Sequence, residues 1–135
     1  MFVLVDIDGT LAIRTSREPF EWSLLHTDKV NSPVVEVVRA LKISGHDIVF
    51  VTGRHEELRR ATELWLLQHV AIPGELIMRP QSDSRPDDVI KEELIRARFQ
   101  DFSEILLVID DRKRVVDMWR QRLGLTCLQV ADGEF

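Results

Sequence analysis

Short apolar runs alternate along the chain with longer segments in which apolar positions recur at helical spacing. The apolar runs end at charged or turn-forming residues. Uninterrupted apolar runs of this length are typical of strands that are covered on both faces of a sheet. The predicted strands are residues 2–7, 47–52, 75–78, 104–109 and 125–130.

The segments between these strands predict helices. Asn31, Ser32 and Pro33 form a helix start signal, because a capping residue precedes a proline in the first turn. The strict alternation of strands and helices indicates an α/β fold, with an open parallel sheet that carries helices on both sides. Residues 11–31 form the least regular connection, which is too short for a second domain but long enough for a flap or a short helix. The predicted helices are residues 33–44, 55–70, 87–99 and 114–123.

Length and composition narrow the class of protein. A chain of 135 residues predicts a single domain, residues 1–135. Cys127 is the only cysteine, so no internal disulfide can form, as expected in a reducing compartment. No apolar stretch approaches the length of a membrane span, and we expect a cytoplasmic protein. The net charge of −5 argues against broad, nonspecific DNA binding.

Polar side chains stand at the ends of three predicted strands. Asp6 and Asp8 end the first strand, Thr52 ends the second, and Asp110 and Asp111 follow the fourth. Open parallel sheets bind ligands at the carboxyl ends of their strands. The sequence therefore predicts a single site that contains these side chains, if the first and fourth strands are neighbours.

The carboxylates predict a hard divalent cation. Asp6 and Asp8 lie two residues apart on a strand and point the same way, so that their charges repel each other. Mg²⁺ prefers oxygen ligands and would offset this repulsion. We expect Asp6, the backbone carbonyl of Asp8, and Asp110 to bind it, with Asp111 acting directly or through water.

The same residues predict phosphate chemistry. Asp6 is the expected nucleophile, and Asp8 the general acid that protonates the leaving oxygen and then deprotonates a water. Lys91, in the helix before the fourth strand, would offset charge on the transferred group. Thr52 would donate its hydroxyl to a phosphate oxygen. Gly9 would allow a sharp turn that brings backbone N–H groups near the phosphate.

These motifs resemble the four motifs of the haloacid dehalogenase superfamily of phosphotransferases. The resemblance implies a Rossmann-like three-layer sandwich with a five-stranded parallel sheet, Mg²⁺, and an aspartyl-phosphate intermediate. No separate cap domain is expected in a chain of this length. The matching residues are Asp6-x-Asp8-Gly9-Thr10, Thr52, Lys91 and Asp110-Asp111.

A closer resemblance covers nearly the whole chain and is to the 3′-phosphatase domain of phage-type polynucleotide kinase/phosphatase. It implies removal of 3′-phosphates from polynucleotide ends, with 2′,3′-cyclic phosphates as a further substrate. Arg17 and Arg54 would contact phosphate or the nucleotide backbone, and Asp87 would orient Lys91 or Arg54. Gly9, Thr10 and Gly53 complete the expected substrate site. The matching stretches are DIDGTLA, VTGR, DSRPDDVIKEE, IDDRKRVVDMWR and GLTCLQVADGEF.

The chain departs from this family in two respects, one on the substrate-facing surface and one that bears on partners. The segment after Arg54 is shorter than expected, and no G-x-x-x-x-G-K-[ST] motif is present. Kinase activity would therefore have to come from elsewhere, which leads us to expect a separate kinase or ligase partner. The expected substrate is a DNA or RNA 3′ end, in the cytoplasm of a bacterial host if the protein is phage-encoded.

Three other functions are compatible with parts of the sequence pattern. A small-molecule or 5′-nucleotide phosphatase would use the same chemistry. A signalling receiver is disfavoured because the third strand ends without an acid, and a nonenzymatic binder would not require four carboxylates. Trp22 either stacks on a base or, as we favour, packs over the site loop. Six basic residues form either a track for a polynucleotide or an ordinary mixed-charge surface: Arg14, Arg79, Arg85, Arg112, Lys113 and Arg114.

Overall fold

A five-stranded parallel sheet forms the centre of the computed structural model, which describes residues 1–134. The strand order β5-β4-β1-β6-β7 confirms the predicted α/β class and makes β1 and β6 neighbours. The strands are β1 (Phe2–Val5), β4 (Asp47–His55), β5 (Gly74–Arg79), β6 (Ile105–Arg112) and β7 (Cys127–Gly133).

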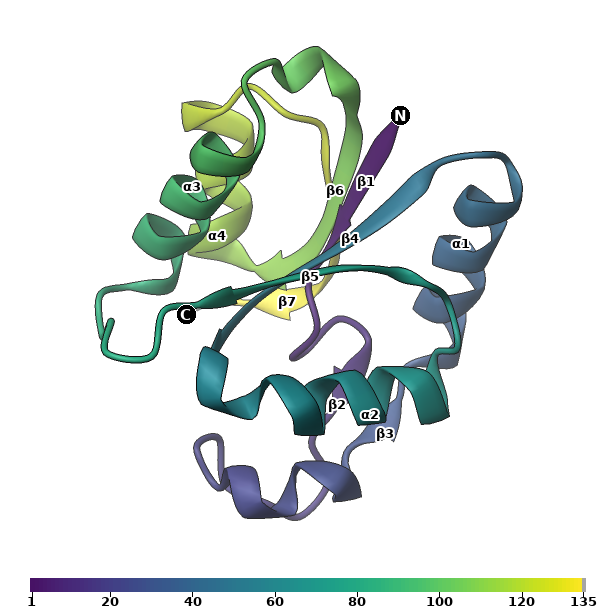
Figure 1. Ribbon diagram of the computed structural model, residues 1–135, viewed down its shortest axis with the longest axis vertical. Helices are drawn as coiled ribbons and strands as arrows, with labels where there is room; N and C mark the ends of the chain where they lie inside the picture. Colours follow the sequence, from purple (N-terminus) through teal and green to yellow (C-terminus); the bar gives the residue numbers. More distant parts are fainter. Residues whose placement is uncertain (135) are drawn as a thin grey trace.

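Helices cover both faces of the sheet because its central strands are apolar on both sides. Val3 and Val5 of β1 pack on one side, and Leu4 between them packs on the other. Helices α1 (Ser32–Ile43) and α2 (Arg59–His69) cover the first face, whereas α3 (Asp87–Arg98) and α4 (Lys113–Asp117) cover the second. Figure 1 shows these two pairs of helices on opposite sides of the sheet.

Two strands run further than their apolar residues predict. Strand β4 continues through Gly53 and Arg54 to His55, with a shift in its register against β5 after Thr52. The following helical region therefore begins with η2 (Glu56–Leu58), and α2 itself begins only at Arg59. Strand β6 likewise includes Asp110 and Asp111. Backbone pairing with the neighbouring strands resumes at His55 and at Arg112, beyond these polar residues, which side-chain polarity does not reveal.

The last predicted helix is divided into two forms. The α-helical part ends at Asp117, and a π-helical segment, η4 (Met118–Arg122), follows it. Local π-helical segments are often found at functional sites. Here the segment contains the buried Trp119, which reaches the carboxyl end of β6. A short helix, η3 (Phe102–Glu104), precedes β6.

The irregular connection contains the short helix that its length allowed, η1 (Trp22–Thr27). On either side of η1, β2 (Ala12–Ile13) pairs with β3 (Lys29–Val30) in antiparallel fashion. The Asn31 side chain does not cap α1 but donates a hydrogen bond of 3.0 Å to the carbonyl of Thr10. No cap domain interrupts residues 1–134, and within them no helix is long and apolar enough to cross a membrane.

The packing on both faces of β1 leads to a stability prediction. Leu4 is completely buried in the central strand, so Leu4→Ala should lower the free energy of unfolding by about 2–5 kcal/mol. Leu67→Ala is a matched control, because that side chain is 70% exposed and its loss should cost less than about 0.5 kcal/mol. Urea unfolding measures both. An equal loss in the two variants would contradict the observed layer arrangement.

Candidate active site

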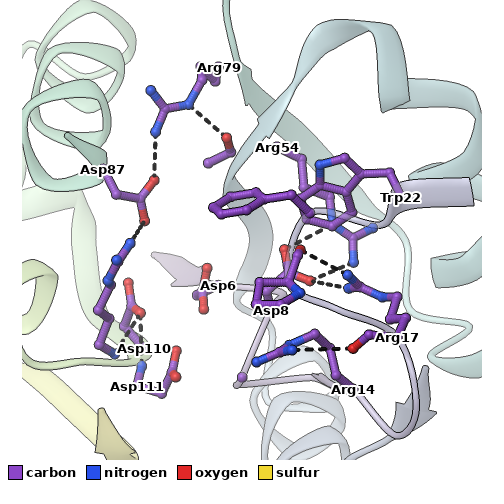
Figure 2. Close-up of a pocket in the computed structure, with 15 residues that line it drawn as sticks. Asp6, Asp8, Arg14, Arg17, Trp22, Arg54, Arg79, Asp87, Asp110 and Asp111 are labelled. Atoms are coloured by element: carbon purple, nitrogen blue, oxygen red, sulfur yellow. Dashed lines mark hydrogen bonds and ion pairs between the residues drawn. The ribbon is translucent and has the colours of Figure 1, made fainter. Parts of the chain in front are cut away.

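Most of the predicted site residues line a cavity of about 510 Å³ at the carboxyl ends of the strands. Thr10, Thr52 and Lys91 are buried behind its lining and do not face it. Asp6 and Asp8 lie just beyond β1, Gly53 and Arg54 in the last part of β4, and Asp110 and Asp111 in the last part of β6. Because β1 lies between β4 and β6, three sequence-distant segments meet there. Figure 2 shows the labelled carboxylates and arginines directed into this cavity.

Three buried carboxylates form a cluster on one side of the cavity. Asp6, Asp110 and Asp111 each offer one oxygen, and these oxygens lie within 4.8 Å of one another. The side chain of Asp8 is not a member of the cluster. The expectation that the backbone carbonyl of Asp8 binds the cation stays a prediction.

Lys91 provides the buried positive charge of this cluster. Its Nζ lies 2.8 Å from Asp6 Oδ1, 3.2 Å from Asp110 Oδ2 and 3.8 Å from Asp87 Oδ2. Burial lowers the pKa of Lys91, but the neighbouring carboxylates outweigh it and raise the pKa well above its usual range. Burial and the charge of Asp110 raise the pKa of Asp6 well above its usual range, against the effect of Lys91. The cluster thus has more negative charge than one ammonium offsets.

Neighbouring polar groups fix the orientation of the carboxylates. The Thr10 hydroxyl lies 2.9 Å from Asp6 Oδ2 and 3.2 Å from Asp111 Oδ1. Thr10 is fully buried and does not line the cavity, so that its hydroxyl serves the carboxylates. Trp119 Nε1 donates to Asp110 Oδ2 at 3.0 Å. These three contacts limit the rotation of the carboxylates.

Two glycines are required where carboxylates approach the backbone. Gly9 has a φ of +83°, and a Cβ there would overlap the carboxylate of Asp111. A Cβ on Gly53 would overlap the carboxylate of Asp87. The predicted turn at Gly9 is therefore present: its positive φ favours glycine, and the Asp111 carboxylate occupies the space that a Cβ would fill.

Asp8 belongs to a second network, on the other side of the cavity. Arg54 donates to both of its oxygens, at 2.9 and 2.7 Å, and an Arg17 nitrogen lies 3.6 Å away. Arg17 also makes a bidentate pair with the buried Asp28, at 2.7 and 2.9 Å. Both arginines line the cavity, as a phosphate contact would require, but in this structure they hold carboxylates.

Trp22 covers these two arginines. Its ring centroid lies 4.7 Å from the Arg17 guanidinium carbon and 5.1 Å from that of Arg54. Figure 2 shows the indole beside Arg54 and above Arg17. The packing interpretation of Trp22 thus agrees with the structure better than the base-stacking one.

Asp87 was predicted to orient Lys91 or Arg54, and it contacts only Lys91 of these two. It approaches Lys91 at 3.8 Å, while Arg79 donates to it at 3.2 Å. Arg54 is instead occupied by Asp8 and by Thr62, whose hydroxyl accepts from it at 3.1 Å. Thr52 is fully buried, and its oxygen accepts from the backbone N–H of Arg54.

Only three of the six residues of the predicted basic track line the cavity. Arg14, Arg79 and Arg112 line the cavity. The other three pair with nearby acids: Arg85 with Asp83 and Glu93, Lys113 with Asp117, and Arg114 with Asp88. The acids that face these outer residues favour an ordinary mixed-charge surface there.

Three residues of the site carried no clear signal in the sequence. Asp28 and Thr62 hold the two arginines, and Trp119 holds Asp110. Asp28 lies in the irregular connection, Thr62 lies within a helix, and Trp119 has the pattern of a core residue. Trp119 lies nine positions after Asp110, within the stretch IDDRKRVVDMWR that carries part of the family resemblance.

The buried ion cluster leads to a prediction with a defined pH dependence. In EDTA, Lys91→Met should destabilise the protein by about 3–5 kcal/mol near pH 8, because it leaves buried carboxylates uncompensated. A carboxyl whose pKa is raised by folding stabilises the fold below its unfolded pKa, and this contribution is lost as pH rises through the folded pKa. Because the pKa of Asp6 is raised, the loss should be smaller at pH 5.5.

Urea unfolding at the two pH values measures this effect. Lys42→Met is the matched control, since Lys42 lies 3.6 Å from the exposed Asp47 in a surface pair. We expect the control to change stability little at either pH. A Lys91→Met protein as stable as the parent at pH 8 would show that the cluster does not depend on the ammonium.

Comparison with known proteins places this geometry in a family. Residues 1–135 match the family described as the polynucleotide kinase PNKP phosphatase domain. The chain is also 32% identical, over 122 residues, to a protein of Autographa californica nuclear polyhedrosis virus that is named for polynucleotide kinase and RNA ligase activities. That match covers 87% of this chain but 17% of the viral protein.

Solved structures give the same result. A chain in the structure of a Pnkp1/Rnl/Hen1 complex is 37% identical and superposes with a TM-score of 0.92, over 98% of this chain and 46% of that one. A class C acid phosphatase from Bacillus anthracis is 13% identical and has a TM-score of 0.67, over 98% of this chain and 67% of the phosphatase, which shows a shared fold. The chain thus spans less than half of its first-named relatives. It belongs to the polynucleotide kinase PNKP phosphatase domains of the haloacid dehalogenase superfamily.

Proposed function

We propose that this chain removes 3′-phosphates from polynucleotide ends through an aspartyl-phosphate formed on Asp6. The observation that carries the proposal is the position of Asp6, which is held by Lys91 and lies with Asp8 at an arginine-lined cavity. Family membership supports a phosphatase that acts on polynucleotide ends. Ends with a 2′,3′-cyclic phosphate are a second substrate to test.

The donor set fits Mg²⁺. Asp6, Asp110 and Asp111 offer only oxygens, and Lys91 alone does not offset their charge. We propose that these carboxylates hold Mg²⁺ together with the carbonyl of Asp8. When bound, Mg²⁺ supplies positive charge that orients the phosphate and stabilises the charge developing on it.

The side chains would then divide the reaction into two steps. A carboxylate oxygen of Asp6 attacks phosphorus, and the bond from phosphorus to the 3′ oxygen breaks as Asp8 donates a proton to that oxygen. In the second step Asp8 takes a proton from water, and the water oxygen attacks phosphorus to release inorganic phosphate and restore Asp6. Lys91 remains beside the carboxylate of Asp6 throughout.

Arg54 contacts Asp8 in this structure, in addition to its predicted role of binding phosphate. The first proposed step requires an oxygen of Asp8 to reach the leaving oxygen, whereas Arg54 occupies both of its oxygens. We propose that the substrate phosphate attracts Arg54 away from Asp8, since guanidinium also binds phosphate in bidentate fashion. The carboxyl group of Asp8 would then be released towards the leaving oxygen when substrate arrives.

The names of the relatives support partners that process the same ends. The viral relative is named for kinase and ligase activities, and the 37% identical chain comes from a complex with Rnl and Hen1. We propose that this domain acts beside a kinase or a ligase, on the same chain or on another. RNA 3′ ends are therefore tested alongside DNA ends.

Phosphate release from 3′-phosphorylated oligonucleotides with Mg²⁺ tests the proposal. Asp6→Asn should lower kcat by more than about a thousandfold, because the nucleophile is lost. Asp8→Asn should lower it by roughly 10²–10⁴-fold, because no acid protonates the leaving group. Asp47→Asn, which alters an exposed carboxylate, should leave the rate unchanged.

The substrate series decides between the candidate activities. Release only from mononucleotides would keep the chemistry and indicate a small-molecule or 5′-nucleotide phosphatase. Release from no phosphomonoester would refute the proposal. Equal activity of Asp6→Asn and the parent would refute the aspartyl-phosphate step alone.

Cation binding is tested separately from turnover. Mg²⁺ at about one hundred times its Kd should stabilise the fold by about 2.7 kcal/mol, and Asp110→Asn should abolish most of this effect. Thermal unfolding with and without Mg²⁺ measures it, with Ca²⁺ for comparison. If Mg²⁺ failed to raise the unfolding midpoint at concentrations that support turnover, the three carboxylates would not be its site.

A further inference from the structure

One wall of the cavity is apolar, although phosphate and cation require only polar partners. The apolar side chains among its lining residues are Pro19, Phe20 and Trp22, and all three come from the connection between β2 and β3. The remaining lining residues are glycines, carboxylates and arginines. An apolar wall beside the nucleophile indicates that part of the ligand, beyond its phosphate, is apolar and flat or bulky.

Phe20 is the member of this wall that is open to a ligand. Its side chain is 85% exposed, the largest value among the exposed large apolar residues of the described chain. Its ring meets the ring of Trp22 edge to face, at a centroid distance of 6.5 Å and an angle of 73°. Trp22 itself already packs against the guanidinium groups of Arg17 and Arg54. Of the two aromatic rings, Phe20 is therefore the one whose surface is accessible to a ligand.

The backbone around Phe20 is held in place. Arg17 Nη1 donates to the carbonyls of Glu18 and Pro19, at 3.2 and 3.0 Å, and the Glu21 N–H donates to the same Glu18 carbonyl at 3.1 Å. Arg17 is itself fixed by its bidentate pair with Asp28. The exposed ring thus stands on a turn anchored from inside the protein, and its exposure is built into the fold.

We propose that Phe20 is a stacking platform for the nucleobase of the terminal nucleotide, the one that carries the phosphate. The inference rests on the proposed function and adds to it the recognition of the base. With the phosphate at Asp6, the base of the same nucleotide would lie on the apolar wall of the same cavity. Stacking uses the face that every base possesses, so Phe20 should favour nucleotide substrates with little preference among the bases.

A cycle of two changes tests the inference, one in the enzyme and one in the substrate. For an oligonucleotide with a normal 3′-terminal nucleotide 3′-phosphate, Phe20→Ala should lower kcat/KM by roughly 5- to 150-fold. For the same oligonucleotide with an abasic terminal residue, it should lower kcat/KM by less than about twofold. Phe20→Tyr, which keeps an aromatic ring, should remain near the parent on both substrates.

Ile43→Ala provides the matched control, since Ile43 is a 79% exposed apolar side chain at the end of α1 and does not line the cavity. It should leave both substrates unaffected. A Phe20→Ala loss that is equal on normal and abasic ends would overturn the stacking role, because the ring would then not be acting on the base. No loss on either substrate would overturn it as well.

Binding gives a readout independent of turnover. With Asp6→Asn, an oligonucleotide that ends in 2-aminopurine 3′-phosphate should lose fluorescence on binding, because stacking quenches that base. With Asp6→Asn combined with Phe20→Ala, the quenching should disappear; quenching that persists would overturn the inference. If the parent releases no phosphate from any oligonucleotide, the proposed function fails, and the inference fails with it. Release by the parent with unchanged Phe20→Ala rates refutes the inference alone.

Discussion

The ammonium of Lys91 is the charge around which the site is assembled. It contacts carboxylates from two adjacent strand ends and one from its own helix, and all of these groups are removed from water to a large extent. Burying such groups is costly unless they are paired and hydrogen-bonded. The sheet order makes the pairing possible, because it places the ends of β1 and β6 side by side, where the side chain of Lys91 reaches both from α3.

The surroundings of this cluster restrict each carboxylate to one arrangement. Thr10 and Trp119 supply hydrogen bonds from the two sides, and Gly9 leaves the space in which Asp111 lies. A second group of charges, centred on Asp8, lies across the cavity and is separately held by Arg54. Asp6 and Asp8 therefore have different electrostatic partners, Lys91 for the first and Arg54 for the second, although they are two residues apart in the chain.

Much of the fold follows from the sequence, because each apolar run coincides with the greater part of one strand, although β4 and β6 extend beyond their runs. The carboxylates that follow the runs at Asp6 and Asp110 consequently mark the correct edge. The exact partners of the charged residues do not follow. Arg54 and Arg17 were expected to contact phosphate, but they pair with Asp8 and Asp28. These pairings depend on distances set by the connection between β2 and β3, which has no regular sequence spacing. Trp119 was likewise hidden, since a buried indole has the same apolar pattern whether or not its N–H meets a carboxylate.

Arg17 links the irregular connection between β2 and β3 to the carboxylate of Asp8. One guanidinium binds Asp28, lies near Asp8, holds the backbone before Phe20 and stacks against Trp22. A change in the length or composition of that connection would therefore be transmitted to the carboxylate of Asp8. Under the proposed function, this segment could not be exchanged without regard to the rest of the site: a grafted segment would have to preserve Arg17 and Asp28, or the chemistry would change along with the substrate selectivity.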